Sequence, residues 1–100
     1  MSTFTQIDLE IETLTGQEEP EARVVLFNDD YHTFDEVIIQ IMKACNYSPE
    51  RAEQISLIVH FKGKATVITS SFQTCQEVAA VLQEIDLLVE IEPISQEKNS

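Results

Sequence analysis

A chain of 100 residues with 43% hydrophobic residues can form one domain with a small core. Its formal net charge of −12 argues against nucleic acid as a partner, because phosphate backbones are bound by clustered Lys and Arg, and favours a cationic or neutral ligand. No apolar run approaches the roughly 18 residues of a membrane span, and the N-terminus lacks the basic start of a signal peptide, so a cytoplasmic protein without a membrane partner is expected.

The first 21 residues differ in composition from the rest of the chain. Residues 1–21 contain six acidic residues and no basic one, and end in the turn-like sequence GQEEPE, which is typical of a mobile acidic tail. The alternating sequence IDLEIE leaves a docked edge strand open as an alternative. A folded domain is therefore expected over residues 22–94, followed by a polar C-terminal tail over residues 95–100.

The sequence ARVVLFN, residues 22–28, is continuously apolar and predicts a central strand covered on at least one face. After DDYH, Thr33 and Glu36 form a T-x-x-E capping box that starts a helix, and Asn46 can end it in a left-handed turn. The apolar residues of this helix recur with helical spacing and are expected to be buried: Phe34, Val37, Ile38, Ile41, Met42 and Cys45.

A second helix is predicted from the N-cap Ser48, with Pro49 at its first position, through ERAEQISLIVHF to Gly63. KATVITS reads as a strand, and Ser70 or Ser71 caps a third helix. The apolar residues of that helix are Phe72, Cys75, Val78, Ala79, Leu82 and Ile85. The final segment LLVEIEP alternates apolar and polar residues, as expected of a half-buried strand that is closed by its proline.

The resulting order, β-α-α-β-α-β, predicts the α+β class: a small sandwich in which three helices pack on a three-stranded, largely antiparallel sheet. Cys45 and Cys75 stand alone inside helical patterns, without CxxC spacing. They are interpreted as small buried apolar residues of a protein in a reducing compartment.

Some polar residues have no evident role in the core. They are the cluster Asn28, Asp29 and Asp30, together with His32 and His60. The cluster is explained by turn chemistry alone, since these residue types favour bends and bond to nearby backbone. A histidine near the end of a helix is likewise favoured by the helix dipole. Both structural interpretations stay open at this point.

A binding site is the alternative. Ser56 and His60 are four residues apart on one helix face, with Val59 beside them, and such a mixture of small, apolar and polar groups is typical of a pocket. Asn offers a carbonyl acceptor, carboxylates only accept, and a neutral imidazole offers one acceptor nitrogen. Acceptors beside an apolar pocket suit an ammonium group attached to a hydrophobic side chain, such as the free α-amino end of a peptide.

A small metal-dependent hydrolase would combine His60 with Asp29 and Asp30. These residues lack the spacing of established metal sites, so neither a metal nor another cofactor is expected. The chain also lacks a Gly-rich nucleophile turn, and no serine or cysteine has the signature of a neighbouring base. A protein without enzymatic activity is therefore favoured.

Two segments, VLFNDDYHTFDEVI and ERAEQISLIVHFKGKA, resemble the ClpS family of adaptor proteins, and the similarity covers about residues 22–92. The resemblance implies a non-enzymatic adaptor of the N-end rule. Such an adaptor binds substrates with a destabilising N-terminal residue, an N-degron, and delivers them for proteolysis to a Clp-type AAA+ unfoldase, ClpA- or ClpC-like. The alternative is a general protein-interaction module on the same scaffold without N-terminal recognition. The acidic tail resembles the mobile extension of the family, and either improves solubility or engages the unfoldase during delivery.

The resemblance also implies roles for single residues. Asn28, Asp30 and His60 match the groups that hold the α-amino end and the first peptide unit, and Asp29 belongs to the same block. The positions that match the lining of the side-chain pocket are Leu26, His32, Phe34, Val37, Ser56, Val59 and Leu87.

Three departures from the family pattern concern the pocket and the docking face. Phe34 and Ser56 stand where many members have Met, so an altered side-chain preference is expected, with branched residues accepted beside Leu, Phe, Tyr and Trp. His32 replaces a commoner small hydroxyl residue, which predicts binding that varies between about pH 5 and about pH 7. The segment from Gly63 to Leu87 is shorter than in many relatives, and the docking face for the unfoldase is not assigned there.

Overall fold

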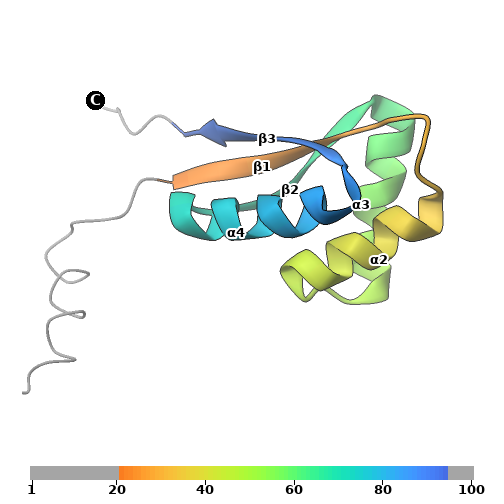
Figure 1. Ribbon diagram of the computed structural model, residues 1–100, viewed down its shortest axis with the longest axis horizontal. Coiled ribbons are helices and arrows are strands. Elements are labelled where there is room, and N and C mark those ends of the chain that lie inside the picture. Colours follow the sequence, from red (N-terminus) through yellow and green to blue (C-terminus); the bar gives the residue numbers. More distant parts are fainter. Residues whose placement is uncertain (1–20, 95–100) are drawn as a thin grey trace, which may run out of the picture.

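A computed structural model describes residues 21–94, which form a three-stranded sheet and three α-helices (Figure 1). The elements are β1 (Glu21–Phe27), α2 (Phe34–Cys45), α3 (Pro49–Lys62), β2 (Lys64–Ser71), α4 (Phe72–Leu82), the short 3-10 helix η1 (Gln83–Ile85) and β3 (Leu88–Pro93). The predicted α+β class and the predicted element order are confirmed. The predictions for residues 1–20, including the docked strand, and for residues 95–100 lie outside the described residues.

Strand β1, which is apolar except for Glu21 and Arg23, is the central strand of the sheet, as predicted. The strand order is β2-β1-β3, and both neighbours run antiparallel to β1. At its C-terminal end, Phe27 pairs with Lys64 of β2 and with Leu88 of β3. The chain therefore leaves the middle of the sheet when it enters the polar sequence that follows β1.

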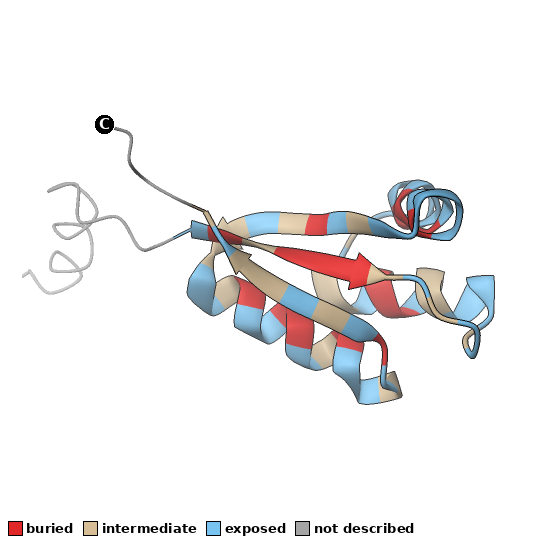
Figure 2. Cartoon of the chain, turned by 90° about the horizontal axis from the view of Figure 1, so that it is seen from above, coloured by how far each residue is buried: buried red, intermediate tan, exposed pale blue. Residues whose placement is uncertain are grey.

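The helices enclose the core from one face and one end of the sheet. Helix α4 contacts all three strands, whereas α2 packs on α3 and α4 at the end of the sheet where β1 stops (Figure 1). Buried residues are concentrated in β1, α3 and α4 (Figure 2). Among residues 21–94, no helix combines the length and the apolar character needed to cross a membrane.

The helix ends follow the predicted local signals. The Thr33 hydroxyl accepts a hydrogen bond from the Glu36 N–H, and the Glu36 carboxylate accepts one from the Thr33 N–H, which completes the capping box of α2. Ser48 caps α3, and Ser71, one of the two predicted candidates, caps α4. Helix α3 ends at Gly63, whose φ of 93° is in the left-handed region that favours glycine.

The structure differs from the predicted burial at several positions. Phe34 was expected in the core but is exposed, because it is the first residue of α2, at the edge of the packed face. Phe72, the first residue of α4, is exposed as well. Ile85 belongs to η1 and not to the third helix. Glu21, assigned to the tail, is the first residue of β1, where it pairs with Ser71.

The two cysteines are free thiols. Cys75 is completely buried, as predicted, whereas Cys45 at the end of α2 is only half-buried. Burial raises the pKa of both thiols, which keeps them in the unreactive protonated form.

Candidate functional site

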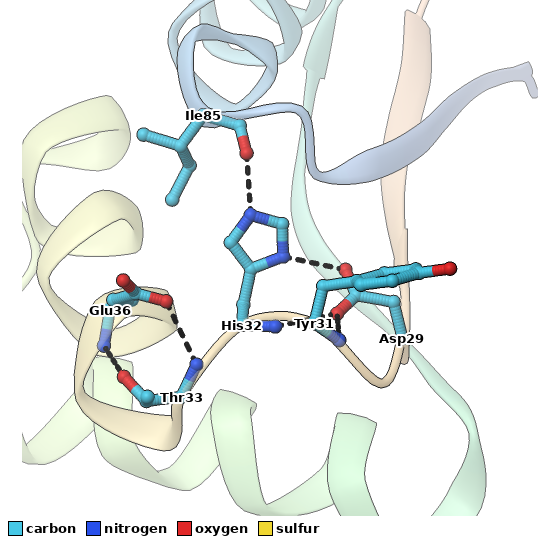
Figure 3. A network of polar contacts seen from close by, with 6 residues as sticks. All are labelled: Asp29, Tyr31, His32, Thr33, Glu36 and Ile85. Atoms are coloured by element: carbon cyan, nitrogen blue, oxygen red, sulfur yellow. Dashed lines mark hydrogen bonds and ion pairs between the residues drawn. The ribbon is translucent and has the colours of Figure 1, made fainter.

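The loop between β1 and α2, residues 28–33, is organised around one carboxylate. Asp29 Oδ1 accepts hydrogen bonds from the backbone N–H of Tyr31 at 2.8 Å and of His32 at 3.0 Å (Figure 3). The Asn28 N–H donates to the Gly63 carbonyl at 2.9 Å, which ties the start of the loop to the end of α3. The turn chemistry expected of the Asn-Asp-Asp cluster is therefore confirmed, and it is performed by Asp29.

His32 connects this loop to a distant part of the chain. Its Nδ1 lies 2.8 Å from Asp29 Oδ2, and its Nε2 lies 2.5 Å from the carbonyl oxygen of Ile85 in η1 (Figure 3). Both partners are acceptors, so only the doubly protonated imidazolium can donate a hydrogen bond to each of them. When it is protonated, His32 therefore connects the 28–33 loop to η1 through both ring nitrogens.

The protonation equilibria of the pair reflect this link. The hydrogen bond to the Asp29 carboxylate raises the pKa of His32; burial opposes this, and the Ile85 carbonyl adds to it. For Asp29, burial works to raise the pKa, but the hydrogen bonds from His32 and Tyr31 outweigh burial and hold the pKa below its ordinary value. Both pKa shifts favour the charged forms of the two groups, the Asp29 carboxylate and the His32 imidazolium.

The raised pKa of His32 makes stability depend on pH. A raised folded-state pKa contributes stability that is complete below the ordinary histidine pKa of 6.5 and is lost as the pH rises through the folded-state value. The free energy of unfolding in urea should therefore fall because of this group as the pH rises from about 6.5 through the raised folded-state pKa of His32. His32→Gln should lose that part of the pH dependence, and equal slopes in the two proteins would contradict the assignment.

A pocket of about 430 Å³ opens between the 28–33 loop, α2 and α3. Its lining consists of Asn28, Asp29, Asp30, His32, Phe34, Val37, Ser56, Leu57, Val59, His60 and Phe61. The loop contributes most of the polar groups, and the helices contribute the apolar ones together with Ser56 and His60. The pocket thus combines apolar walls with hydrogen-bond acceptors, as ligand sites commonly do.

The pocket brings together nearly all of the predicted site residues. Leu26 and Leu87 are the exceptions, because they line a separate cavity of about 20 Å³. That cavity shares Val37 and Val59 with the main pocket, so the two adjoin. Both leucines are buried core residues that support the pocket and do not face its main volume.

Two lining residues were not predicted from the sequence, Leu57 and Phe61. Phe61 is 74% exposed, and its ring meets the His60 ring edge-on, with 4.9 Å between the centroids. A signal was present, because α3 carries more apolar side chains than its buried face uses. Apolar residues left over on a helix beside polar pocket residues are candidates for ligand contact.

The hydrogen-bond acceptors of the pocket differ in whether other groups of the protein already bond to them. The Asp29 carboxylate already binds His32 and the loop backbone. The side chains of Asn28, Asp30 and His60 make no hydrogen bond to another group within residues 21–94. No group of three or more His, Cys, Asp or Glu side chains suited to a metal ion occurs in that same range.

Comparison with known families identifies the scaffold. The family model described as ATP-dependent Clp protease adaptor protein ClpS matches residues 17–88. The chain belongs to the ClpS family. The sequences NDD and VHFKG, which supply the polar groups of the pocket, both lie within the residues that match the ClpS model.

Two curated relatives carry the name ATP-dependent Clp protease adapter protein ClpS, one from Cronobacter sakazakii and one from Escherichia coli O1:K1 / APEC. Each is 46% identical over 43 residues, which are 43% of this chain and 41% of the relative, so the match spans about two fifths of the relatives' length. The structure of Agrobacterium tumefaciens ClpS2 bound to L-phenylalaninamide superposes with a TM-score of 0.72 and covers 77% of this chain and 100% of that one. Its sequence identity of 19% supports the shared ClpS fold alone.

Proposed function

We propose that this protein is a cytoplasmic, non-enzymatic adaptor that binds proteins through a destabilising N-terminal residue and delivers them to a Clp-type AAA+ unfoldase, ClpA- or ClpC-like, for degradation. The proposal is supported chiefly by one observation. Acceptors of Asn28, Asp30 and His60 to which no group within residues 21–94 bonds lie on the same pocket as the apolar residues Phe34 and Val37. Membership in the ClpS family supports it further, as does the phenylalanine derivative bound to the A. tumefaciens ClpS2 of similar fold.

The acceptor groups suit a free amino terminus. A peptide α-amino group has a pKa of about 7.7–8.0, so at neutral pH most of it is an ammonium with three N–H donors. The Asp30 carboxylate and the Asn28 side-chain carbonyl can only accept from such donors, and a neutral His60 can accept through one ring nitrogen. The net charge of −12 also attracts a cationic chain end.

The apolar part of the pocket suits the side chain of the first residue. Hydrogen bonds to charged groups contribute about 1.5–3 kcal/mol each, and burial of one large side chain contributes about 1.5–3 kcal/mol. These gains must offset several kcal/mol of lost translational and rotational freedom. Two or three such bonds and one buried side chain give a dissociation constant of order micromolar.

Acetylation of the peptide tests the proposal directly. A Phe-initiated peptide with a free amine should bind with a Kd of order micromolar in isothermal titration. The N-acetylated form of the same peptide should bind at least about 100-fold more weakly, because it has lost its charge and crowds the acceptors. Binding of neither form would contradict the proposal, and equal binding of both would favour a general interaction module.

Delivery requires a second measurement. A folded reporter that begins with Phe should be degraded by a Clp unfoldase-protease faster in the presence of this protein, and the same reporter beginning with Gly should not. Accelerated loss of both reporters, or of neither, would contradict adaptor function even if the peptide binds.

A further inference from the structure

One polar group of the pocket is both buried and unsatisfied. Ser56 is 3% exposed, and its hydroxyl oxygen has no hydrogen-bond partner within residues 21–94. Ser56 nevertheless lines the 430 Å³ pocket. A serine inside a helix commonly bonds to the carbonyl four residues earlier, yet this hydroxyl makes no such bond.

A buried hydroxyl without a hydrogen-bond partner is unfavourable. The Ser56 hydroxyl is already out of contact with solvent, so a purely apolar side chain placed beside it leaves that cost unchanged. A side chain that brings a hydrogen-bonding group to this point avoids that cost. Since a hydroxyl both donates and accepts, either kind of partner satisfies it.

The position of Ser56 indicates where in the ligand such a group must lie. His60 is exposed, whereas Ser56, one helical turn earlier on the same face of α3, is buried. The pocket therefore extends along α3 by about 6 Å, from its mouth at His60 to its floor at Ser56. Apolar side chains, among them Val37 and Val59, line the remainder, so the ligand needs an apolar body with a polar tip.

We propose that Ser56 determines the specificity of the pocket and selects an N-terminal tyrosine over phenylalanine. The inference rests on the proposed recognition of free N-terminal residues. With its ammonium at the mouth, the tyrosine ring fills the apolar middle and its phenol reaches the Ser56 hydroxyl. Tyrosine is suited to this arrangement because its apolar ring carries a hydroxyl at the far end.

The test compares three peptides that differ only in the first residue: Tyr, Phe and para-methylphenylalanine, which has the shape of tyrosine without its hydrogen-bonding group. The native protein should bind the Tyr peptide about fivefold more tightly than either of the others in isothermal titration. Ser56→Ala should bring the affinities of Tyr and Phe to within about twofold, and Ser56→Thr, which keeps the hydroxyl, should retain the preference. A role of Ser56 in packing alone would change all three affinities together.

The outcomes separate this inference from the proposed function. Equal or weaker binding of Tyr relative to Phe and para-methylphenylalanine by the native protein overturns the role of Ser56 and leaves N-terminal recognition intact. A Tyr preference that Ser56→Ala leaves unchanged also overturns it. Failure of every peptide to bind the native protein overturns both. The comparison of Tyr with para-methylphenylalanine needs no variant, so it can overturn the inference even if Ser56→Ala fails to fold.

Discussion

Replacing Asn28 by Ala together with Asp30 by Asn should weaken the binding of a Phe-initiated peptide at least about 100-fold, because the side-chain acceptor of Asn28 and the negative charge of Asp30 are removed at once. The fold should survive, since the Asn28 N–H that bonds to Gly63 belongs to the backbone and Asp30 is exposed. Isothermal titration measures the affinity, and urea unfolding verifies the stability of the variant.

A matched control removes a charge without touching the pocket. Asp35 is an exposed acid in the first turn of α2 and is not among the lining residues. Asp35→Asn changes the net charge by the same amount as Asp30→Asn and should leave the affinity within about twofold. If the control weakens binding as much as the double variant, general attraction by the acidic surface, and not local acceptors, holds the amino terminus.

Leu26→Ala should produce the largest loss of stability among the substitutions considered, about 2.5–5 kcal/mol in urea unfolding. Leu26 is 1% exposed near the C-terminal end of the central strand, where its neighbours are Ala65 in β2 and Val89 in β3. Removing its side chain enlarges the small cavity that it lines, and the neighbouring strands and helices prevent the site from collapsing. Such a loss is a large part of the roughly 5–15 kcal/mol of a typical domain.

Leu88→Ala is the control for this substitution. Leu88 lies in the edge strand β3, opposite Phe27, but it is 57% exposed. The same chemical change should therefore cost about 1 kcal/mol or less. If the two variants are equally stable, Leu26 is not a central element of the core.

Local signals in the sequence were sufficient to predict the helices and strands of the fold. The capping box of Thr33 and Glu36, the Ser48-Pro49 start and Gly63 act within a few residues of the chain, so their effects do not depend on distant packing. Burial was predicted less well at the helix ends. Periodicity identifies which face of α2 turns inward, but it does not say how far along that face the core extends, and Phe34 lies beyond it.

Most residues that line the pocket were predictable for a different reason. The spacing of Ser56 and His60 on one helix turn, and the clustering of Asn28, Asp29 and Asp30 after a strand, are visible in the sequence, and the pocket contains all five residues. The roles within the cluster were not visible. Asp29 and Asp30 are adjacent and chemically identical, yet Asp29 is occupied by the loop and His32, whereas Asp30 makes no such contact within residues 21–94.

The sequence by itself determined the class of fold, the starts of the helices and the chemistry available near the pocket, because these depend on residue type and on the spacing of a few positions. Only the tertiary structure decided that His32 bonds across 53 residues to Ile85 and that the buried Ser56 hydroxyl has no hydrogen-bond partner within residues 21–94. Both properties arise where separate segments meet, and residue type alone does not say which distant group fills the space beside a side chain.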